Sequence, residues 1–427
     1  MTQHAATAPT VKVYRVGGSV RDELLGRPVV DRDWVVVGAT PEMLIASGYR
    51  PVGRDFPVFL HPETREEYAL ARTERKHGRG YRGFEFFVSP DVTLEEDLAR
   101  RDLTINAMAR DERGTLVDPF HGAADLKARV LRHVSPAFVE DPLRVLRVAR
   151  FAARFGFAIA PETEALMGEL AASGELASLA PERVWQEFAR GLMEPHPSRM
   201  LAVLRACGAL AQLMPEADAM YGGPGPRVRH RASAAGTHVA RALDCAASRG
   251  CPLPVRYAVL ARDLGKPAGA GTLDRRGLVA SRVRLAERMS VRLRVPVECR
   301  DAARLAARWH GVVGRARDLP PSALLDLLNA ADALRRPERL DALLDACACD
   351  ALSRAGAGDD FAPARIVRAA LAVVAGVDAG AIARSEAAKR TAGGDAIAKA
   401  VRAARLKALR AWRRAPVPAK RIRSGKR

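Results

Sequence analysis

The chain changes its hydrophobic pattern at about residue 137, and this change limits the folds that it can adopt. Between residues 11 and about 130, short runs rich in β-branched and aromatic residues alternate with turn signals, as in VKVYRV, DWVVVG, FPVFLH and EYALAR. From about residue 137, apolar residues recur at helical spacing, as in PLRVLRVARFAARFGF. Strands followed by helices indicate the α+β class. We therefore expect a small mixed α/β head followed by an elongated, all-helical body.

Turn-forming residues and charge divide the helical part further. The cluster GGPGP at residues 222–226 is the best candidate for a domain boundary. Residues 402–427 hold eleven Lys or Arg and no acid, and two prolines interrupt any helix there, so we expect a partly disordered tail. The predicted parts are a head at 1–136, a neck at 137–222, a helical domain at 223–320, a C-terminal helical region at 321–401 and a basic tail at 402–427.

The whole chain is strongly basic. Its 427 residues include 69 Lys and Arg against 49 Asp and Glu, which gives a formal charge of +20. Because basic side chains bound to phosphates release counterions, this excess favours a nucleic-acid partner. The sequence has no run of about 18 apolar residues and no secretory signal at its start, so we expect a cytoplasmic protein without a membrane partner. The six cysteines lack metal-ligand spacing, which favours buried free thiols.

Two carboxylates, Asp31 and Asp33, introduce the apolar run DWVVVG. On a strand, residues two apart share one face about 6 to 7 Å apart, so both carboxylates can converge on one Mg²⁺ or on a pair of Mg²⁺ ions. Two such ions can activate an attacking hydroxyl and neutralise a departing pyrophosphate. Taken alone, the pair is also typical of turn or surface acids, so the neighbouring sequence decides between the two interpretations.

The segment GGSVRD at residues 17–22 lies just upstream of the two acids. Gly17 and Gly18 allow backbone N–H groups to approach a triphosphate, and the helix start that follows favours negative charge. Arg21 is then placed to neutralise phosphate oxygens. The combination of a Gly-Gly turn, an arginine and an Asp-x-Asp pair within so short a stretch indicates nucleotide chemistry.

These motifs carry a resemblance to a known family. GGSVRD followed by DRDWVVVG resembles the head of class II nucleotidyltransferases of the DNA polymerase β superfamily. The segments VGRDFPVFLHP, EEYALARTERK, LEEDLARRDLTINAMA, DPFHGAADL and EDPLRVLRVARFAARFGF follow in the order seen in bacterial tRNA nucleotidyltransferases, the CCA-adding enzymes. The resemblance covers residues 11 to about 220 and implies a polymerase β-like head.

The resemblance implies roles for the residues that match the family's motifs. Glu67 occupies the place where related polymerases keep a third carboxylate, but a surface acid on a strand is equally plausible, and we leave it out of the predicted site. The matching residues are Asp31 and Asp33 for the catalytic metal pair and Gly18, Arg21 and Arg101 for the triphosphate.

The segment EDPLRVLRVAR at residues 140–150 is expected to select the nucleotide. As a helix it would place Asp141 and Arg144 on one face, an acceptor beside a donor. Cytosine and adenine both present an exocyclic amine beside a bare ring nitrogen, whereas guanine and uracil invert that pattern. The pair can thus admit CTP and ATP without a template. The resemblance assigns it this role, with Arg147 and Arg150 as further nucleotide contacts; the alternative is a surface helix with intrahelical ion pairs.

The basic segment TERKHGRGYRG at residues 73–83 is typical of a mobile loop. Its counterpart in the family is similar to a flexible element needed for switching from C to A addition. An ordinary exposed loop is an equally open interpretation.

The second half departs from the family. His238, Arg262 with Asp263, and His310 lie where many Gram-negative members carry a metal-dependent HD phosphohydrolase domain. Arg262 stands at the position of the HD histidine, stays protonated and cannot ligate a cation, and a downstream His-rich stretch is replaced by GTLDRRGLVAS. We expect residues from about 228 to 320 to retain an HD-like fold for packing or tRNA contact, with structural histidines and without phosphohydrolase activity.

The sequence therefore predicts an enzyme that adds C, C and A to tRNA 3′ ends from CTP and ATP, acting as a monomer or a dimer. The tRNA 3′-hydroxyl would attack the α-phosphate in line. The nearest competing hypothesis is a bacterial poly(A) polymerase with the same head. A tRNA-binding protein without catalysis and a metal phosphohydrolase built on the second half are competing hypotheses from different classes.

Overall fold

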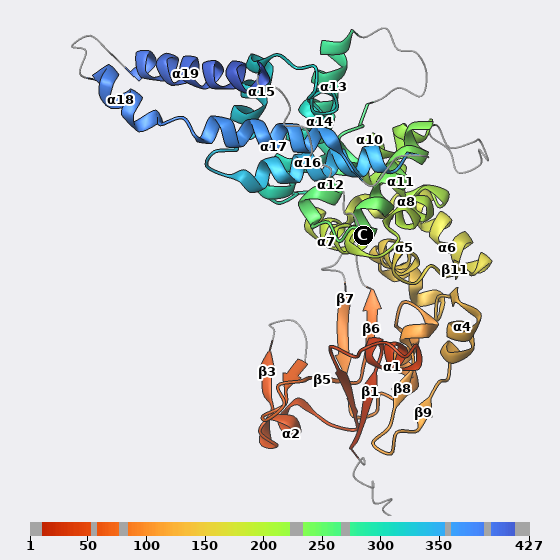
Figure 1. Cartoon of the computed structure of the whole chain (residues 1–427). Coiled ribbons are helices and arrows are strands. Elements are labelled where there is room, and N and C mark those ends of the chain that lie inside the picture. Colours follow the sequence, from red (N-terminus) through yellow and green to blue (C-terminus); the bar gives the residue numbers. More distant parts are fainter. Residues whose placement is uncertain are drawn as a thin grey trace, which may run out of the picture. The chain divides into compact units, whose positions relative to one another are not determined.

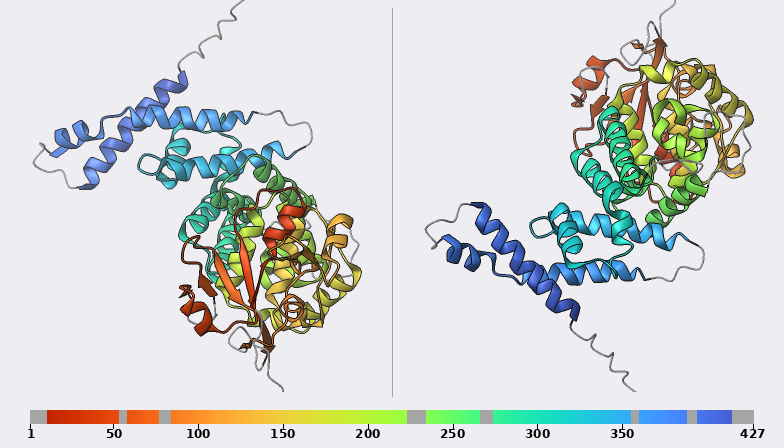
Figure 2. Two further views of the ribbon diagram at one scale, coloured as in Figure 1. Left: turned by 90° about the horizontal axis from the view of Figure 1, so that it is seen from below. Right: turned by 90° about the horizontal axis from the view of Figure 1, so that it is seen from above.

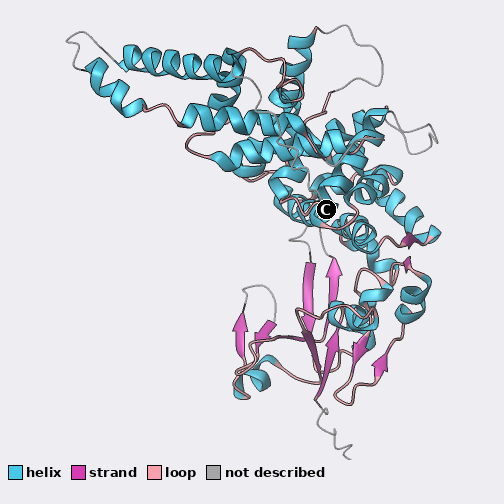
Figure 3. Cartoon of the chain, in the orientation of Figure 1, coloured by secondary structure: helices cyan, strands magenta, loops and turns pink. Residues whose placement is uncertain are grey.

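The computed structural model describes residues 11–52, 58–76, 84–222, 234–265, 274–354, 360–387 and 394–414. The chain divides into two compact units. The first comprises Met1–Ser233 with the short segment Val291–Val295, and the second comprises Ala234–Ser290 and Pro296–Arg427. Among the described residues, strands occur only in the first unit (Figure 3). The predicted fold class, a mixed α/β head followed by a helical body, is confirmed.

A seven-stranded mixed sheet forms the head, with the strand order β3-β4-β5-β2-β1-β8-β9 (Figure 1). The central strand β2 pairs with β1 antiparallel and with β5 parallel. The strands are β1 (Lys12–Val16), β2 (Asp33–Val37), β3 (Arg50–Val52), β4 (Val58–Leu60), β5 (Glu67–Leu70), β8 (Ala109–Arg110) and β9 (Leu116–Val117).

The four predicted β-rich runs all contain strands, but one detail of the prediction is wrong. Asp31 and Asp33 do not follow each other on one strand, because β2 begins at Asp33. Asp33 pairs with Val16, the last residue of β1, and the chain leaves the sheet at Gly17 to enter α1 (Gly18–Leu24). Asp31 therefore lies just before the strand, without a partner on β1 to hold it in the sheet.

The alternation of side chains along β2 builds two separate cores. Val35 packs with Leu94 and Leu98 of α3 (Leu94–Ala99), whereas Val36 packs with Leu44 of α2 (Pro41–Ala46) on the other face. Because side chains two apart share a face, Asp33 lies on the same face as Val35, the face that α3 covers.

A two-stranded hairpin follows the sheet. β6 (Arg72–Lys76) pairs antiparallel with β7 (Phe84–Val88). The predicted loop at 73–83 is therefore wrong for its first four residues, which belong to β6 because each pairs with a β7 residue. The rest of that segment, residues 77–83, lies outside the described residues.

The remaining elements of the first unit are mostly helices. The long helix α5 (Leu143–Phe155) packs on α7 and α8 and ends at Gly156, whose φ of 70° stops it. The others are α4 (Gly122–Ala128), α6 (Pro161–Ala172), α7 (Pro181–Met193), α8 (Pro197–Ala206), α9 (Ala209–Leu213) and α10 (Pro215–Asp218), with the short 3₁₀ turns Thr104–Asn106, Pro136–Glu140, Glu175–Ser178 and Ala219–Tyr221 and the strand pair β10 (Val130–Leu131) and β11 (Ala158–Ile159).

The second unit is helical. α12 packs on α11, α14 and α16, and α19, the darkest blue helix, lies across α15 and α17 (Figure 2). The helices are α11 (Ala234–Ser248), α12 (Leu253–Ala261), α13 (Arg275–Arg292, whose last two residues fall in the first unit), α14 (Val297–Val313), α15 (Pro321–Ala330), α16 (Pro337–Leu352), α17 (Ala362–Ala375), α18 (Ala379–Ala387) and α19 (Gly394–Arg414).

Two sequence predictions can be compared with these helices. The basic tail at residues 402–427 was expected to be partly disordered. Residues 402–414 instead continue helix α19, and residues 415–427 lie outside the described residues. The six cysteines are free thiols, and all except the half-buried Cys245 are buried, as predicted.

Within the described ranges, no helix by itself has both the length and the apolar composition to cross a membrane. The pair α17 and α18 meets these two criteria only when taken together, across a bend of 42°.

Candidate active site

A basic pocket of about 550 Å³ opens in the first unit, where α1, β2, the end of α3, α5 and α7 meet. Its lining includes nine arginines against three aspartates, so the pocket carries a large excess of positive charge. Such an excess attracts and concentrates anionic ligands. The pocket brings together eight of the nine predicted site residues, namely Gly18, Arg21, Asp33, Arg101, Asp141, Arg144, Arg147 and Arg150.

Asp33 supplies a carboxylate to one wall of this pocket. Desolvation raises the pKa of Asp33, the Arg101 guanidinium opposes this shift, and the carboxylate of Asp31 adds to it. Asp31 is not among the lining residues, yet its charge acts on Asp33. Both residues are solvent-exposed. A carboxylate whose ionisation is opposed by a neighbouring carboxylate is stabilised by a nearby cation.

Glu67 lies directly beside Asp33. It is the first residue of β5, and the parallel register of β2 and β5 places the two residues opposite each other. Partners in such a register point to the same face of the sheet. The sequence could not decide whether Glu67 lies near the metal-binding acids or is an ordinary surface acid, because a lone acid at a strand end is typical of both. The register of β2 and β5 places it next to Asp33.

The donor set at this edge of the sheet is chemically suited to a divalent cation. Asp31, Asp33 and Glu67 are exposed carboxylates, and hard oxygen donors are the ligands that Mg²⁺ prefers. The residues present therefore fit the predicted metal.

Gly17 has a different role from the one that its motif predicted. Its N–H donates to the carbonyl of Met108 at 3.1 Å, so this group is used inside the fold rather than offered to a phosphate. Its φ is 70°, and a Cβ at this position would lie 2.7 Å from Nη1 of Arg101. Gly17 is thus required for the close approach of the Arg101 guanidinium to the start of α1.

Arg21 is buried although it carries a charge. Its Nε donates to Asp22 at 2.8 Å, and its Nη1 donates to Oδ1 of Asn106. Its guanidinium lies over the rings of Phe151 and Phe155, 5.3 and 4.9 Å from their centres. These contacts with α5 hold the side chain at the pocket wall, where its charge faces the cavity.

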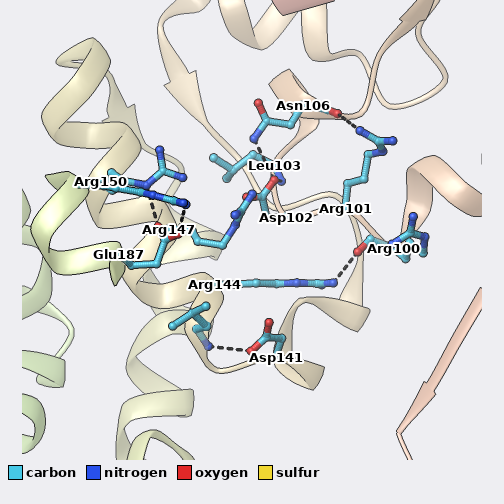
Figure 4. Close-up of polar contacts among 12 residues, drawn as sticks. Arg100, Arg101, Asp102, Leu103, Asn106, Asp141, Arg144, Arg147, Arg150 and Glu187 are labelled. Atoms are coloured by element: carbon cyan, nitrogen blue, oxygen red, sulfur yellow. Dashed lines mark hydrogen bonds and ion pairs between the residues drawn. The ribbon is translucent and has the colours of Figure 1, made fainter. Parts of the chain in front are cut away.

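Asp102 is a site residue that sequence reasoning missed. It is 5% exposed, and it accepts hydrogen bonds from Nε of Arg147 at 2.7 Å and from Nδ2 of Asn106 at 2.9 Å (Figure 4). Although burial acts to raise it, the pKa of Asp102 is lowered to about 2 by Arg147, Asn106 and Arg144. The sequence did offer one signal, since Asp102 is an acid between Arg101 and an apolar stretch. An acid in such a stretch is expected to be buried, and a buried carboxylate needs a charged or hydrogen-bonding partner.

Asp102 and Asn106 connect the two sides of the pocket. Asn106 accepts from Arg21 of α1 while it donates to Asp102, and Asp102 accepts from Arg147 of α5. The triphosphate-side arginine and the α5 arginine thereby belong to one hydrogen-bonded chain. Such a chain fixes the orientation of both guanidinium groups.

Asp141 and Arg144 line the pocket, but they do not share a helical face as predicted. Asp141 is extended, with φ −113° and ψ 102°, because Pro142 follows it and disfavours helical backbone at the preceding residue. Its Oδ1 accepts from the Leu143 N–H at 3.0 Å, and its Oδ2 pairs with Arg183 of α7 at 3.1 Å. The alternative of an Asp141–Arg144 ion pair within a helix is not what the structure shows, since Arg183 is the cation that pairs with Asp141.

The guanidinium of Arg144 is fixed by backbone carbonyls. Its Nη1 donates to Ala137 O at 2.8 Å, and its Nη2 donates to Arg100 O (Figure 4). Farther along α5, Nε of the buried Arg150 donates to Glu187 of α7 at 2.7 Å. Arg183 and Glu187 both lie on α7, in the part of the chain that the sequence predicted only to be helical.

In the second unit, the predicted HD-like residues also come together. Asp350 of α16 pairs with His238 of α11 and with Arg262, which follows α12. The neighbouring Asp263 lies 3.8 Å from Nε2 of His310 on α14. Burial lowers the pKa of His310, although the carboxylate of Asp263 opposes this shift. Asp350 is a member of the cluster that the sequence did not indicate.

Comparisons with known families and proteins agree with this architecture. The family described as "Poly A polymerase head domain" matches residues 13–132, and "Probable RNA and SrmB- binding site of polymerase A" matches residues 156–221. A multifunctional CCA protein of Azoarcus sp. (strain BH72) is 56% identical over 416 residues, covering 96% of this chain and 100% of the relative. One of Nitrosomonas europaea is 60% identical over 376 residues, covering 87% of this chain and 91% of the relative.

Among solved structures, the chain is similar to the Bacillus stearothermophilus CCA-adding enzyme in complex with CTP. The TM-score is 0.63 at 25% identity, over 94% of this chain and 89% of that one. A CCA-adding enzyme in complex with ATP has a TM-score of 0.61 at 22% identity, over 93% and 86% of the two chains, which extends the likeness of fold.

Proposed function

The chain belongs to the multifunctional CCA proteins, a family of bacterial class II CCA-adding enzymes, and from this premise we propose how its pocket performs the reaction. The protein is a tRNA nucleotidyltransferase that adds C, C and A to tRNA 3′ ends without a template. The observation that carries the assignment of roles is the arginine-rich pocket with Asp33 in its wall and Glu67 beside it.

The carboxylates of Asp31 and Asp33, with Glu67 next to them, hold Mg²⁺ at the exposed edge of β2 and β5. Bound there, the cation would lower the pKa of the tRNA 3′-hydroxyl and offset the charge of the leaving pyrophosphate. The effect of the Asp31 charge on Asp33 supports this role, because a cation bound beside Asp33 offsets that charge.

The triphosphate binds at the start of α1. Gly18 lets the chain approach the phosphates, while Arg21 and Arg101 neutralise their oxygens and hold the α-phosphate in line with the attacking hydroxyl. The rings of α5 behind Arg21 and the glycine beside Arg101 keep both guanidinium groups in place before a nucleotide arrives.

Asp141 and Arg144 read the base of CTP and ATP. The carboxylate accepts from the exocyclic amine, and the guanidinium donates to the bare ring nitrogen. Their geometry comes from tertiary contacts rather than from a shared helical face, because Arg183 and the Leu143 N–H orient Asp141 while carbonyls orient Arg144. Arg147 and Arg150 add positive charge and stand in fixed positions through Asp102 and Glu187.

The tRNA is held through its backbone and shape, by the matched RNA-binding region at 156–221 and by the basic second unit. We further propose a cytoplasmic location, where tRNA and nucleoside triphosphates are available. The predicted parts 137–222, 223–320 and 321–401 are proposed as neck, HD-like domain and tRNA-binding region.

The decisive experiment is incubation with labelled CTP and ATP on a tRNA that lacks its last three nucleotides, followed by sequencing of the product. We expect addition of C, C and A and then termination. A second reaction, with a tRNA that ends in CC and ATP as the only nucleotide, distinguishes CCA addition from poly(A) synthesis. One added adenosine supports the proposal, and a long A tail contradicts it.

The hypothesis of a non-catalytic tRNA-binding protein is tested by Asp31→Ala. We expect this variant to lose nucleotide incorporation while its affinity for tRNA, measured by filter binding, stays close to that of the wild type. Full incorporation by this variant would contradict the role of the acidic pair.

A further inference from the structure

The second unit encloses a cluster of charged side chains that the nucleotide pocket does not use. His238, Asp263 and Asp350 each offer one ligand atom, and these three atoms all lie within 4.8 Å of one another. Asp263 is buried and the other two residues are half-buried. An imidazole nitrogen and two carboxylate oxygens at this spacing are a donor set that suits a divalent transition metal.

Arg262 fills the same space. Its side chain is fully buried, at 0% exposed. Its Nη2 lies 2.7 Å from Oδ1 of Asp350, its Nε lies 3.3 Å from Oδ2 of Asp263, and its Nη1 donates to the Ala346 carbonyl at 3.4 Å. A guanidinium is stable in the interior only where acceptors compensate its charge, and here the two candidate metal ligands do so.

A metal ion and the Arg262 guanidinium exclude each other at this position. The Asp350 oxygen next to Arg262 is the same atom that pairs with Nε2 of His238, so two of the three ligand atoms are engaged with each other and with a cation. An ion would have to lie about 2 Å from those ligand atoms, close to a positive charge that arginine cannot lose. Its binding would therefore require that Arg262 leave the interior.

We propose that Arg262 is a built-in cation that takes the place of a divalent ion in this cluster. The guanidinium closes the cluster to metals and ties α12 to the carboxylate on α16, which in turn holds His238 of α11. Shortening Arg262 opens a metal site formed by His238, Asp263 and Asp350. The inference concerns the second unit alone and does not depend on the roles proposed for the nucleotide pocket.

The experiment measures the number of Co²⁺ ions bound per full-length chain by equilibrium dialysis. We expect the wild type and His238→Ala to bind the same number, because Arg262 closes the cluster. Arg262→Ala should bind one equivalent more, with a visible absorption band from imidazole ligation that the wild type lacks. The double variant Arg262→Ala with His238→Ala should lose both the extra equivalent and the band.

Arg262→Lys is the matched control. It keeps a positive charge next to the two carboxylates, and we expect it to bind no additional ion. Thermal unfolding gives a second readout. Without metal, Arg262→Ala should melt about 10 °C below the wild type, because two carboxylates lose their counter-charge, and Co²⁺ should restore most of this difference while leaving the wild-type midpoint unchanged.

Two results would overturn the proposal. One is an Arg262→Ala protein that binds no additional Co²⁺. The other is a wild-type protein that loses one equivalent of Co²⁺ on His238→Ala, since this would mean that a metal already occupies the cluster. If Arg262→Ala is insoluble alone, its recovery as folded protein with one extra equivalent when purified in Co²⁺ supports the proposal, and continued insolubility counts against it.

Discussion

Arginines and aspartates meet in both units, and the two settings have opposite consequences. In the nucleotide pocket, nine arginines face three aspartates around an open cavity of about 550 Å³. In the second unit, Arg262 is fully buried against Asp263 and Asp350. The excess charge of the pocket is available to an anionic ligand, whereas the charge of Arg262 is used by the fold. Removing one acid from each place should therefore affect different properties.

The largest expected effect comes from the matched pair Asp33→Asn and Asp350→Asn. We expect Asp33→Asn to lower the rate of CMP incorporation by about three orders of magnitude, the scale seen when a group that stabilises transition-state charge is removed. Its melting temperature should stay close to that of the wild type, because Asp33 is solvent-exposed. Asp350→Asn should instead lower the melting temperature by about 10 °C and leave incorporation by the folded protein unchanged.

Incorporation assays and calorimetry on the same preparations measure both properties. The comparison fails if Asp33→Asn melts as early as Asp350→Asn, or if Asp350→Asn loses incorporation while it remains folded.

Nucleotide selection gives the next largest effect. Asp141→Ala removes the acceptor that we assign to the exocyclic amine, and a good base contact discriminates by about 1 to 3 kcal/mol. The preference for CTP over UTP, measured as the ratio of kcat/KM values, should therefore fall by about 5- to 150-fold. Arg183→Ala leaves the carboxylate in place and removes only its partner, so a smaller fall is expected. An unchanged ratio in Asp141→Ala would exclude Asp141 from base reading.

Asp102 lines the pocket, but its charge is compensated within the protein, as that of Arg262 is in the second unit. Arg147 and Asn106 donate hydrogen bonds to its carboxylate. Its pKa is lowered to about 2, below the ordinary value of 3.8, so the carboxylate stabilises the fold above pH 4, and this stabilisation is lost as the pH falls towards 2. Asp102→Asn should reduce the free energy of unfolding at pH 7 by about 2 kcal/mol.

Urea denaturation at pH 7, 5 and 3, followed by tryptophan fluorescence, measures this contribution. Between pH 5 and pH 3 the wild type should lose more stability than Asp102→Asn does, since the variant has no carboxylate to protonate there. Equal losses would show that Asp102 does not depend on its partners as described.

The smallest effect is expected at Gly17. Gly17→Ala places a Cβ 2.7 Å from Arg101 at a φ of 70°, so it should cost about 1 to 2 kcal/mol of stability and raise the KM of CTP and ATP several-fold. Gly26→Ala is the control, because its φ is 66° but no atom lies within 4 Å of the added Cβ. A rise in KM that is equal in both variants would mean that backbone strain, rather than displacement of Arg101, is responsible.

The sequence predicted a strand-rich part followed by a helical part, and it identified eight of the residues that line the pocket. Periodicity alone identified β1, β2 and α5, and the family motifs identified Arg21, Arg101 and Asp141, which line one cavity in the structure. The roles of these residues remain predictions that the experiments above address.

What the sequence could not provide was the set of partners that orient each charge. Arg183 lies 42 residues from Asp141, and Arg147 lies 45 residues from Asp102, so no local pattern links them. The extended backbone of Asp141 could have been predicted, because a proline disfavours helical backbone at the residue before it. The sequence analysis instead treated residues 140–150 as one helix. Glu67 became adjacent to Asp33 only through the parallel register of β5 on β2.

The charge excess of the pocket has a consequence for turnover. Pyrophosphate, the leaving product, carries the same crowded negative charge as the triphosphate from which it comes, so the excess positive charge of the pocket retains it by the same attraction. Accumulating product should therefore slow successive rounds of addition and favour reversal, and an added pyrophosphatase should keep the reaction moving forward.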